Sequence, residues 1–368
     1  MPTNFDLENI FIVNLFGCLL ICLLLLTSRW RFKDNSEENK NLTILMICSL
    51  SNCIADPLSY LFIGHPGHFA RIFIAVSTSW LYVSIMLTSF YWLRFLAAHL
   101  KSPLSQLHNG CLFVAIASGI FLLCINFIEP LSFSLDDNNF YHRETFYNYF
   151  LCIDYGILID SIIFYFCTRL RGGVFKSFPL WAYLLPAIIG GSVQTFFYGN
   201  SVLSVSLAIS LAGILVSLQN EKLFRDQESG LYNRNYLNFL QRVSAKIRPT
   251  KMTAILLTVH DFRKINLSFP QNSFIQNFAQ MLKTAVGDRG NSIHCDGDEF
   301  LILITSQENS AIENCLQELQ SEIDKFNFHN ASPYLLAIDY DIRPFDFSQD
   351  SFIQILQNQE RKLFNITQ

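Results

Sequence analysis

Hydrophobic and polar positions divide this chain into two parts with different patterns. In residues 1–220 long apolar runs alternate with short polar segments, whereas residues 221–368 mix apolar and charged positions at short intervals. About 20 apolar residues are enough for a helix to cross the ~30 Å hydrocarbon core of a membrane. Seven runs have about this length, at 8–27, 42–64, 72–93, 111–130, 149–168, 178–197 and 201–218. The pattern predicts an all-α polytopic membrane region of about seven helices over residues 1–220.

Basic residues between the runs predict the orientation of this region. Eleven follow the odd-numbered runs, and only two, Arg71 and Arg143, lie in the opposite loops. Because Lys and Arg concentrate in cytoplasmic loops, we expect the N-terminus outside and residues 221–368 in the cytoplasm. Acidic residues (Asp6, Glu8) precede the first run, where a signal peptide would be basic, so we expect it to remain as a membrane helix.

Composition agrees with a division between lipid and water. The chain is 51% hydrophobic and 15% charged, against about 25% charged in soluble domains. Residues 221–368 carry 15 basic and 18 acidic residues, so this part is a mildly acidic soluble domain with no footprint for nucleic acid. Eight of the ten cysteines lie in or beside apolar runs and none forms a CxxC pair, which indicates small apolar residues rather than metal ligands.

Three carboxylates, Asp56, Asp154 and Asp160, lie inside the apolar runs without a Lys or Arg at matching depth. An ionisable group at membrane depth is costly and is a functional candidate for that reason. One interpretation is local hydrogen bonding to hydroxyls such as those of Ser59 or Tyr155, or to water. The other is a ligand or proton site, which makes the three acids candidate sensor residues.

The soluble part predicts alternating strands and helices. Thr253–Val259 is apolar enough to be a central strand. Ser292–Cys295 and Phe300–Ile304 alternate as a hairpin around Asp296-Gly297-Asp298-Glu299, and Asp-Gly is a common sequence in such turns. Residues 308–326 have the period of a helix. Residues 334–340 predict another strand and 350–364 another helix.

Three motifs in this part resemble the GGDEF domain, the module that makes cyclic di-GMP from two GTP. They are QESGLYNR after Asp226 (family DxLTGLxNRR), HDFRKIN at 260–266 (family DIDxFKxIN) and DGDEF at 296–300. The resemblance covers about 226–364. It implies an α/β (α+β) nucleotidyl-cyclase fold, a palm-like antiparallel sheet flanked by helices. It also implies a bacterial cell membrane and places the domains at 1–220 (seven-helix sensor region) and 221–368 (cytoplasmic GGDEF-like domain).

The resemblance also implies the roles of individual residues. Asp298 would be the metal ligand, with Glu299 beside it in the turn and Arg263 in place of the lysine that faces the phosphates. Mg²⁺ or Mn²⁺ would be the cofactor of an active enzyme. GTP or cyclic di-GMP would be the ligand, and two subunits would join head to tail as a homodimer. The nucleotide-binding positions would be Asn266, Asn272, Phe262, Asp296 and Gly297.

Two departures from the family bear on catalysis. Thr258 stands where the family has the first metal-binding aspartate, and Asp296 replaces the first glycine of the signature. A neutral hydroxyl is a poor ligand for a hard cation, so a two-metal arrangement is difficult to assemble. Asp261 or Asp296 remain alternative sources of the missing carboxylate.

Three functions follow from these observations. The favoured one is a catalytically impaired GGDEF protein that binds GTP or a partner and relays a membrane signal. The second is an active membrane-bound diguanylate cyclase, and the third is a transporter with a soluble appendage.

Overall fold

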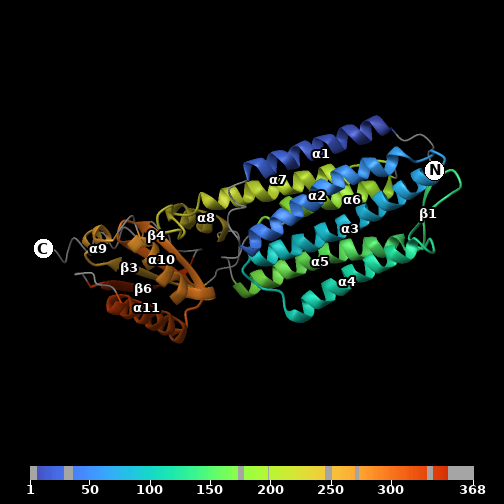
Figure 1. The fold of residues 1–368 in the computed structure, drawn as a ribbon. Coiled ribbons are helices and arrows are strands. Elements are labelled where there is room, and N and C mark those ends of the chain that lie inside the picture. Colours follow the sequence, from blue (N-terminus) through green and yellow to red (C-terminus); the bar gives the residue numbers. More distant parts are fainter. Residues whose placement is uncertain are drawn as a thin grey trace. The chain divides into compact units, whose positions relative to one another are not determined.

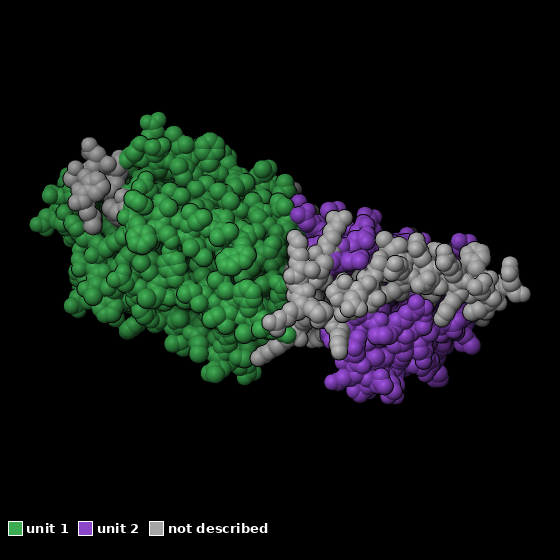
Figure 2. All heavy atoms as spheres, turned by 180° about the vertical axis from the view of Figure 1, so that it is seen from behind, with its two compact units in different colours: residues 1–170, 177–218 green, residues 171–176, 219–368 purple. Residues whose placement is uncertain are grey.

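A computed structural model describes residues 6–28, 36–172, 178–197, 199–244, 251–269, 273–329 and 335–346. The chain forms two compact units, shown in different colours in Figure 2. The first comprises residues 1–170 and 177–218, and the second comprises 171–176 and 219–368.

Helices make up almost all of the first unit and run along a common direction (Figure 1). Three of them begin at side-chain caps, where Asp6, Ser36 and Ser105 accept hydrogen bonds from backbone N–H groups of the first turn. Six described helices are long and apolar enough to cross a membrane. They are α1 (Leu7–Thr27), α2 (Glu37–Leu61), α3 (His68–His99), α4 (Gln106–Asn126), α5 (Tyr147–Gly172) and α7 (Leu203–Lys222).

The sixth predicted run also contains a helix, but a shorter one. This helix, α6 (Trp181–Phe196), has sixteen residues with Pro186 inside it, which at 1.5 Å per residue gives about 24 Å. The prediction of about seven helices is confirmed, with six of them of full spanning length. The loop between α4 and α5 contains a small antiparallel hairpin, β1 (Phe133–Leu135) and β2 (Tyr141–Arg143).

An antiparallel sheet with the strand order β4-β5-β3-β6 organises the second unit (Figure 1). Its strands are β3 (Lys251–Val259), β4 (Gly290–Asp296), β5 (Glu299–Ile304) and β6 (Ile338–Asp346). Its helices are α8 (Arg234–Ser244), α9 (Phe262–Ser268), α10 (Ser273–Val286) and α11 (Asn309–His329), with a single 3₁₀ turn at Gly287–Arg289.

Each face of this sheet carries its own apolar core. Ile255, Leu257 and Val259 of β3 pack in one cluster with α9, α10 and α11. The alternate residues Met252, Ala254 and Leu256 pack in another cluster with α8. This alternation is what a strand buried on both faces requires, and it confirms the predicted central strand.

The predicted helix over 308–326 is confirmed as α11, but the predicted strand over 334–340 is wrong in position. Strand β6 begins four residues later and ends at Asp346. The prediction followed the apolar run at 335–338, whereas the strand itself is polar at alternate positions because it lies at the edge of the sheet. The predicted helix over 350–364 lies outside the described residues.

Candidate functional site

The hairpin of β4 and β5 places the signature residues at a tight turn. Asp296 pairs with Glu299, so Gly297 and Asp298 occupy the two turn positions, and the predicted hairpin around residues 296–299 is confirmed. Gly297 has φ +47°, a left-handed conformation that favours glycine. The carbonyl of Asp298 accepts a hydrogen bond from the N–H of Val259 at 3.1 Å. The turn is thereby tied to the end of the central strand.

Thr258 lies between two acidic residues of neighbouring strands. It pairs with Glu299 on β5 and with Asp339 on β6. Residues directly opposite in an antiparallel sheet point to the same face, so a neutral hydroxyl separates two carboxylates. Within the part of the chain that the structure describes, no three His, Cys, Asp or Glu side chains form a group that could hold a metal ion. Thr258 therefore contributes a neutral oxygen rather than a carboxylate at this point of the sheet.

Asp261 and Asp296 are the two alternative sources of the missing metal-binding carboxylate, and both have surroundings that the structure defines. Asp261 has φ +50°, immediately precedes α9, and its carboxylate contacts the Lys264 ammonium at 2.7 Å. Asp296 is exposed, on the strand opposite Glu299. Asp339 is not among the residues predicted from the sequence, and its carboxylate also lies 2.8 Å from the His260 ring. Finding Asp339 requires the register of β6 against β3, and the prediction from the apolar pattern began that strand four residues too early.

The predicted nucleotide-binding residues have different surroundings. Asn266 has a buried side-chain oxygen, Oδ1, without a hydrogen-bond partner among the described residues. Phe262 packs against Phe274 and Phe300, with ring centroids 5.7 and 6.4 Å away, so it belongs to the core. Arg263 is exposed. Asn272 lies outside the described residues.

His294 connects the motif that begins at Asp226 to the signature turn at residues 296–299. Its Nδ1 lies 3.1 Å from the carboxylate of Asp226 and its Nε2 lies 3.0 Å from the carbonyl oxygen of Gly297. Burial raises the pKa of Asp226, but hydrogen bonds from Ser229 and His294 outweigh this effect, and the net result is a lowered pKa. His294 is not predictable from the sequence, because its contacts join motifs that are distant along the chain.

The segment after α7 is bonded to strand β4. Within the segment, the N–H of Asn233 donates to the carbonyl of Phe224 at 2.8 Å, and the Asn233 side chain donates to the carbonyl of Leu223 at 2.8 Å. Tyr232 then pairs with β4, because its N–H donates to Ser292 at 3.3 Å and its carbonyl accepts from His294 at 2.8 Å. A continuous set of backbone contacts therefore leads from the end of α7 to the strand that enters the signature turn.

Two of the three candidate carboxylates in the helices have hydroxyl partners. Ser201 donates to Oδ2 of buried Asp56, and Ser89 donates to Asp154 at 3.3 Å. The hydroxyls expected from the sequence bond elsewhere. Ser59 donates to a backbone carbonyl at 2.7 Å, and Tyr155 contacts another serine hydroxyl at 3.3 Å. The partners differ because they come from segments distant in sequence.

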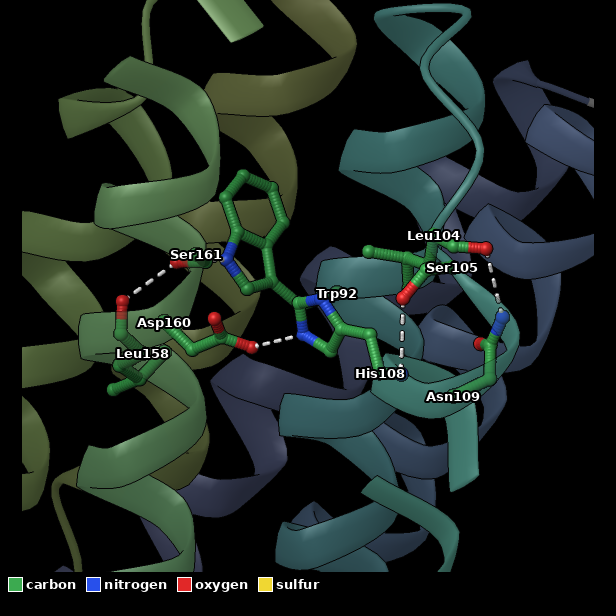
Figure 3. A network of polar contacts seen from close by, with 8 residues as sticks. All are labelled: Trp92, Leu104, Ser105, His108, Asn109, Leu158, Asp160 and Ser161. Atoms are coloured by element: carbon green, nitrogen blue, oxygen red, sulfur yellow. Dashed lines mark hydrogen bonds and ion pairs between the residues drawn. The ribbon is translucent and has the colours of Figure 1, made fainter. Parts of the chain in front are cut away.

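The third carboxylate, Asp160, faces a histidine of the neighbouring helix (Figure 3). Its Oδ2 lies 2.7 Å from Nε2 of His108, and both side chains are about one-third exposed. On the next residue, Ser161 accepts a hydrogen bond from the Trp92 indole at 3.1 Å. His108 lies at the polar start of α4, where Ser105 caps its N–H. This position explains why the apolar pattern did not reveal the pair.

Comparison with protein families identifies the second unit. Residues 223–367 match the family model described as "Diguanylate cyclase, GGDEF domain". These residues form a GGDEF domain of cyclic di-GMP signalling, and the six apolar helices before it make the chain a multi-pass membrane protein. The expected combination of helical membrane region and α/β domain is confirmed.

The solved structures that resemble the chain have low sequence identity and low TM-scores. The GGDEF domain of FimX from Pseudomonas aeruginosa is 15% identical with a TM-score of 0.31, over 38% of this chain and 90% of that one. DgcB from Caulobacter crescentus, solved with c-di-GMP, is 12% identical with a TM-score of 0.34, over 41% and 83%. SiaD from Pseudomonas aeruginosa, solved with its activator SiaC, is 13% identical with a TM-score of 0.35, over 74% and 92%. None of the curated proteins matches the chain.

Proposed function

We propose that this protein is a membrane sensor of cyclic di-GMP signalling whose degenerate GGDEF domain binds GTP or a protein partner without forming product. The proposal rests on the position of Thr258. It lies opposite Glu299, at the end of the strand that is bonded to the signature turn. A threonine hydroxyl brings no negative charge to a divalent cation, and hard cations prefer carboxylate oxygens.

The charge of the turn supports the same proposal. Asp296, Asp298 and Glu299 place three carboxylates within four residues. Two unit charges about 5 Å apart repel by roughly 3 kcal/mol at an effective dielectric constant of about 20. A triphosphate approaching this turn meets that repulsion, and the donors that would hold neutralising metal ions are incomplete. Turnover is disfavoured more than binding, because the base can be recognised away from the turn.

Asn266 supports retained nucleotide binding. Its Oδ1 is buried and accepts no hydrogen bond from the described residues. A buried polar atom without a partner is costly, and a ligand that donates an N–H group removes that cost. The Watson–Crick edge of guanine offers such donors, so Asn266 is the proposed contact for the base.

A single assay tests the proposal. The full chain in lipid nanodiscs is incubated with GTP and either Mg²⁺ or Mn²⁺, and cyclic di-GMP and bound GTP are both measured. We expect GTP binding without product. Product that is abolished in the Asp298→Ala variant would overturn the impaired assignment. Absence of both binding and product would leave a protein partner as the ligand of the domain.

An active cyclase is the alternative, and Asp339 is the observation that favours it. This carboxylate lies opposite Thr258 on the same face of the sheet, where it adds an anionic donor on the far side of the threonine. Under this alternative the wild-type protein makes product and Asp339→Asn abolishes it. Under the proposed function neither protein makes product, and the same assay separates the two.

The proposed setting is a bacterial cytoplasmic membrane, with the N-terminus outside and the GGDEF domain in the cytoplasm. The excess of basic residues in one set of loops supports this orientation. A homodimer is the proposed assembly, by resemblance to the GGDEF family, in which two subunits each present one GTP. Asp56, Asp154 and Asp160 are the proposed sensor residues of the helices.

A further inference from the structure

The helices of the first unit enclose a cavity of about 150 Å³. Residues from α2, α3, α5, α6 and α7 line it, together with Tyr141 and Arg143 of β2. Two of the buried acids, Asp56 and Asp154, are among the lining residues, whereas Asp160 is not. The cavity therefore combines acidic groups and hydroxyls in a part of the chain that is otherwise apolar.

The charges on the lining are unbalanced. Among the described residues of the lining, Arg143 is the only basic one. The Arg143 guanidinium donates to the backbone carbonyls of Thr195 at 2.8 Å and Gln194 at 3.4 Å, and it lies over the ring of Tyr147 at 4.3 Å. Both of these hydrogen bonds go to carbonyl groups. These contacts of Arg143 are with carbonyl oxygens and an aromatic ring rather than with Asp56, which favours a positively charged occupant beside that acid.

Asp56 is the residue beside which a positively charged occupant would bind. Its side chain is 1% exposed, and Oδ2 accepts the hydrogen bond from Ser201. The other oxygen, Oδ1, is buried and has no hydrogen-bond partner among the described residues. A carboxylate oxygen in such a place needs a donor, and an ionised acid at membrane depth needs a counter-charge. An ammonium group supplies both.

Aromatic rings surround the same space. Tyr82, Tyr147, Phe150, Tyr155 and Tyr183 all contribute to the lining. The faces of aromatic rings attract cations, more strongly where water is excluded. A cavity of about 150 Å³ has room for a molecule of benzene size. The lining thus fits a small cation with an apolar body.

We propose that this cavity binds a small protonated organic amine, with Asp56 as its counter-ion and the tyrosine rings around its apolar part. The inference deepens the sensor role proposed above by assigning the chemical class of the stimulus, and it rests on that role only for its link to signalling. Binding is measured directly, so its failure is distinguishable from failure of the GTP assay.

The test compares three probes that share one ring and differ in charge. Benzylamine, benzyl alcohol and benzoate are titrated at pH 7 into the full chain in nanodiscs, with calorimetry as the readout. We expect benzylamine to bind with a Kd of about 1 mM or tighter. Benzyl alcohol is expected to bind at least tenfold more weakly, and benzoate not at all. Equal binding of amine and alcohol, or no binding of the amine, would overturn the proposal.

Variants then locate the site. Asp56→Asn is expected to weaken benzylamine binding at least tenfold and leave benzyl alcohol unchanged, because only the ion pair is lost. Asp56→Glu keeps the charge and is expected to retain the preference for the amine over the alcohol. Asp137→Asn is the matched control, since Asp137 is exposed and does not line the cavity. Undiminished benzylamine binding by Asp56→Asn would refute the assigned counter-ion, and the comparison of probes on the wild type holds even if a variant does not fold.

Discussion

Replacing Thr258 with aspartate returns a carboxylate to the strand beside the signature turn. If the missing charge limits catalysis, Thr258→Asp should make at least tenfold more cyclic di-GMP than the wild type, because hard cations bind carboxylate oxygen. Product formation from GTP and Mn²⁺ is the measurement. Thr258→Asn is the matched control, since asparagine has nearly the same shape as aspartate but carries no charge. Equal product from the two variants would show that the charge at this position is not limiting.

Asp226 should make the domain sensitive to acid. Its pKa is lowered in the folded protein, against about 3.9 in an unfolded chain. The stabilisation that ionised Asp226 gives the folded domain is therefore present above about pH 4. It is lost as the pH falls through the pKa of Asp226 in the folded protein. Asp226→Asn should be less stable than the wild type at pH 7, and the difference should shrink towards pH 3. Urea denaturation of residues 221–368 followed by circular dichroism measures it, with the exposed Glu313→Gln as control.

At the scale of elements, α11 is held to the sheet by one apolar stripe. Leu319 is fully buried within the cluster on that face. Leu319→Ala should lower the free energy of unfolding by about 2–5 kcal/mol, the usual cost of truncating a buried leucine. The exposed neighbour Gln317 provides the control, and Gln317→Ala should change it by less than about 0.5 kcal/mol. Similar losses in the two variants, measured by urea denaturation, would argue against this packing.

The elements that could be predicted from the sequence are those with a strong apolar period. The membrane helices, the strand that contains Leu257 and the stripe of α11 all follow from such periods. Strand β6 was misplaced, because the prediction followed the continuous apolar run before it rather than the alternation of apolar and polar residues over 338–343. The site was harder still. The partners of Thr258 depend on strand register, and those of Asp56 and Asp160 depend on the packing of distant helices.

At the scale of the whole molecule, the orientation in the membrane is open to a direct test. Green fluorescent protein fused after Gln368 should fluoresce, because it would remain in the cytoplasm. Alkaline phosphatase fused after Asp137 should be active, because that loop is expected outside. The opposite pattern of activities in bacterial cells would reverse the orientation that the basic residues predict.

The attachment of Tyr232 to β4 has a consequence for handling the GGDEF domain in isolation. Strand β4 is at one end of the strand order, and Tyr232 occupies hydrogen-bonding groups on its outer side. A truncated protein beginning at Arg234 would lack this cover and present a bare strand, the kind of surface on which chains stack and precipitate. The residues between the last membrane helix and α8 thus keep the domain soluble, and soluble preparations should begin before Leu223.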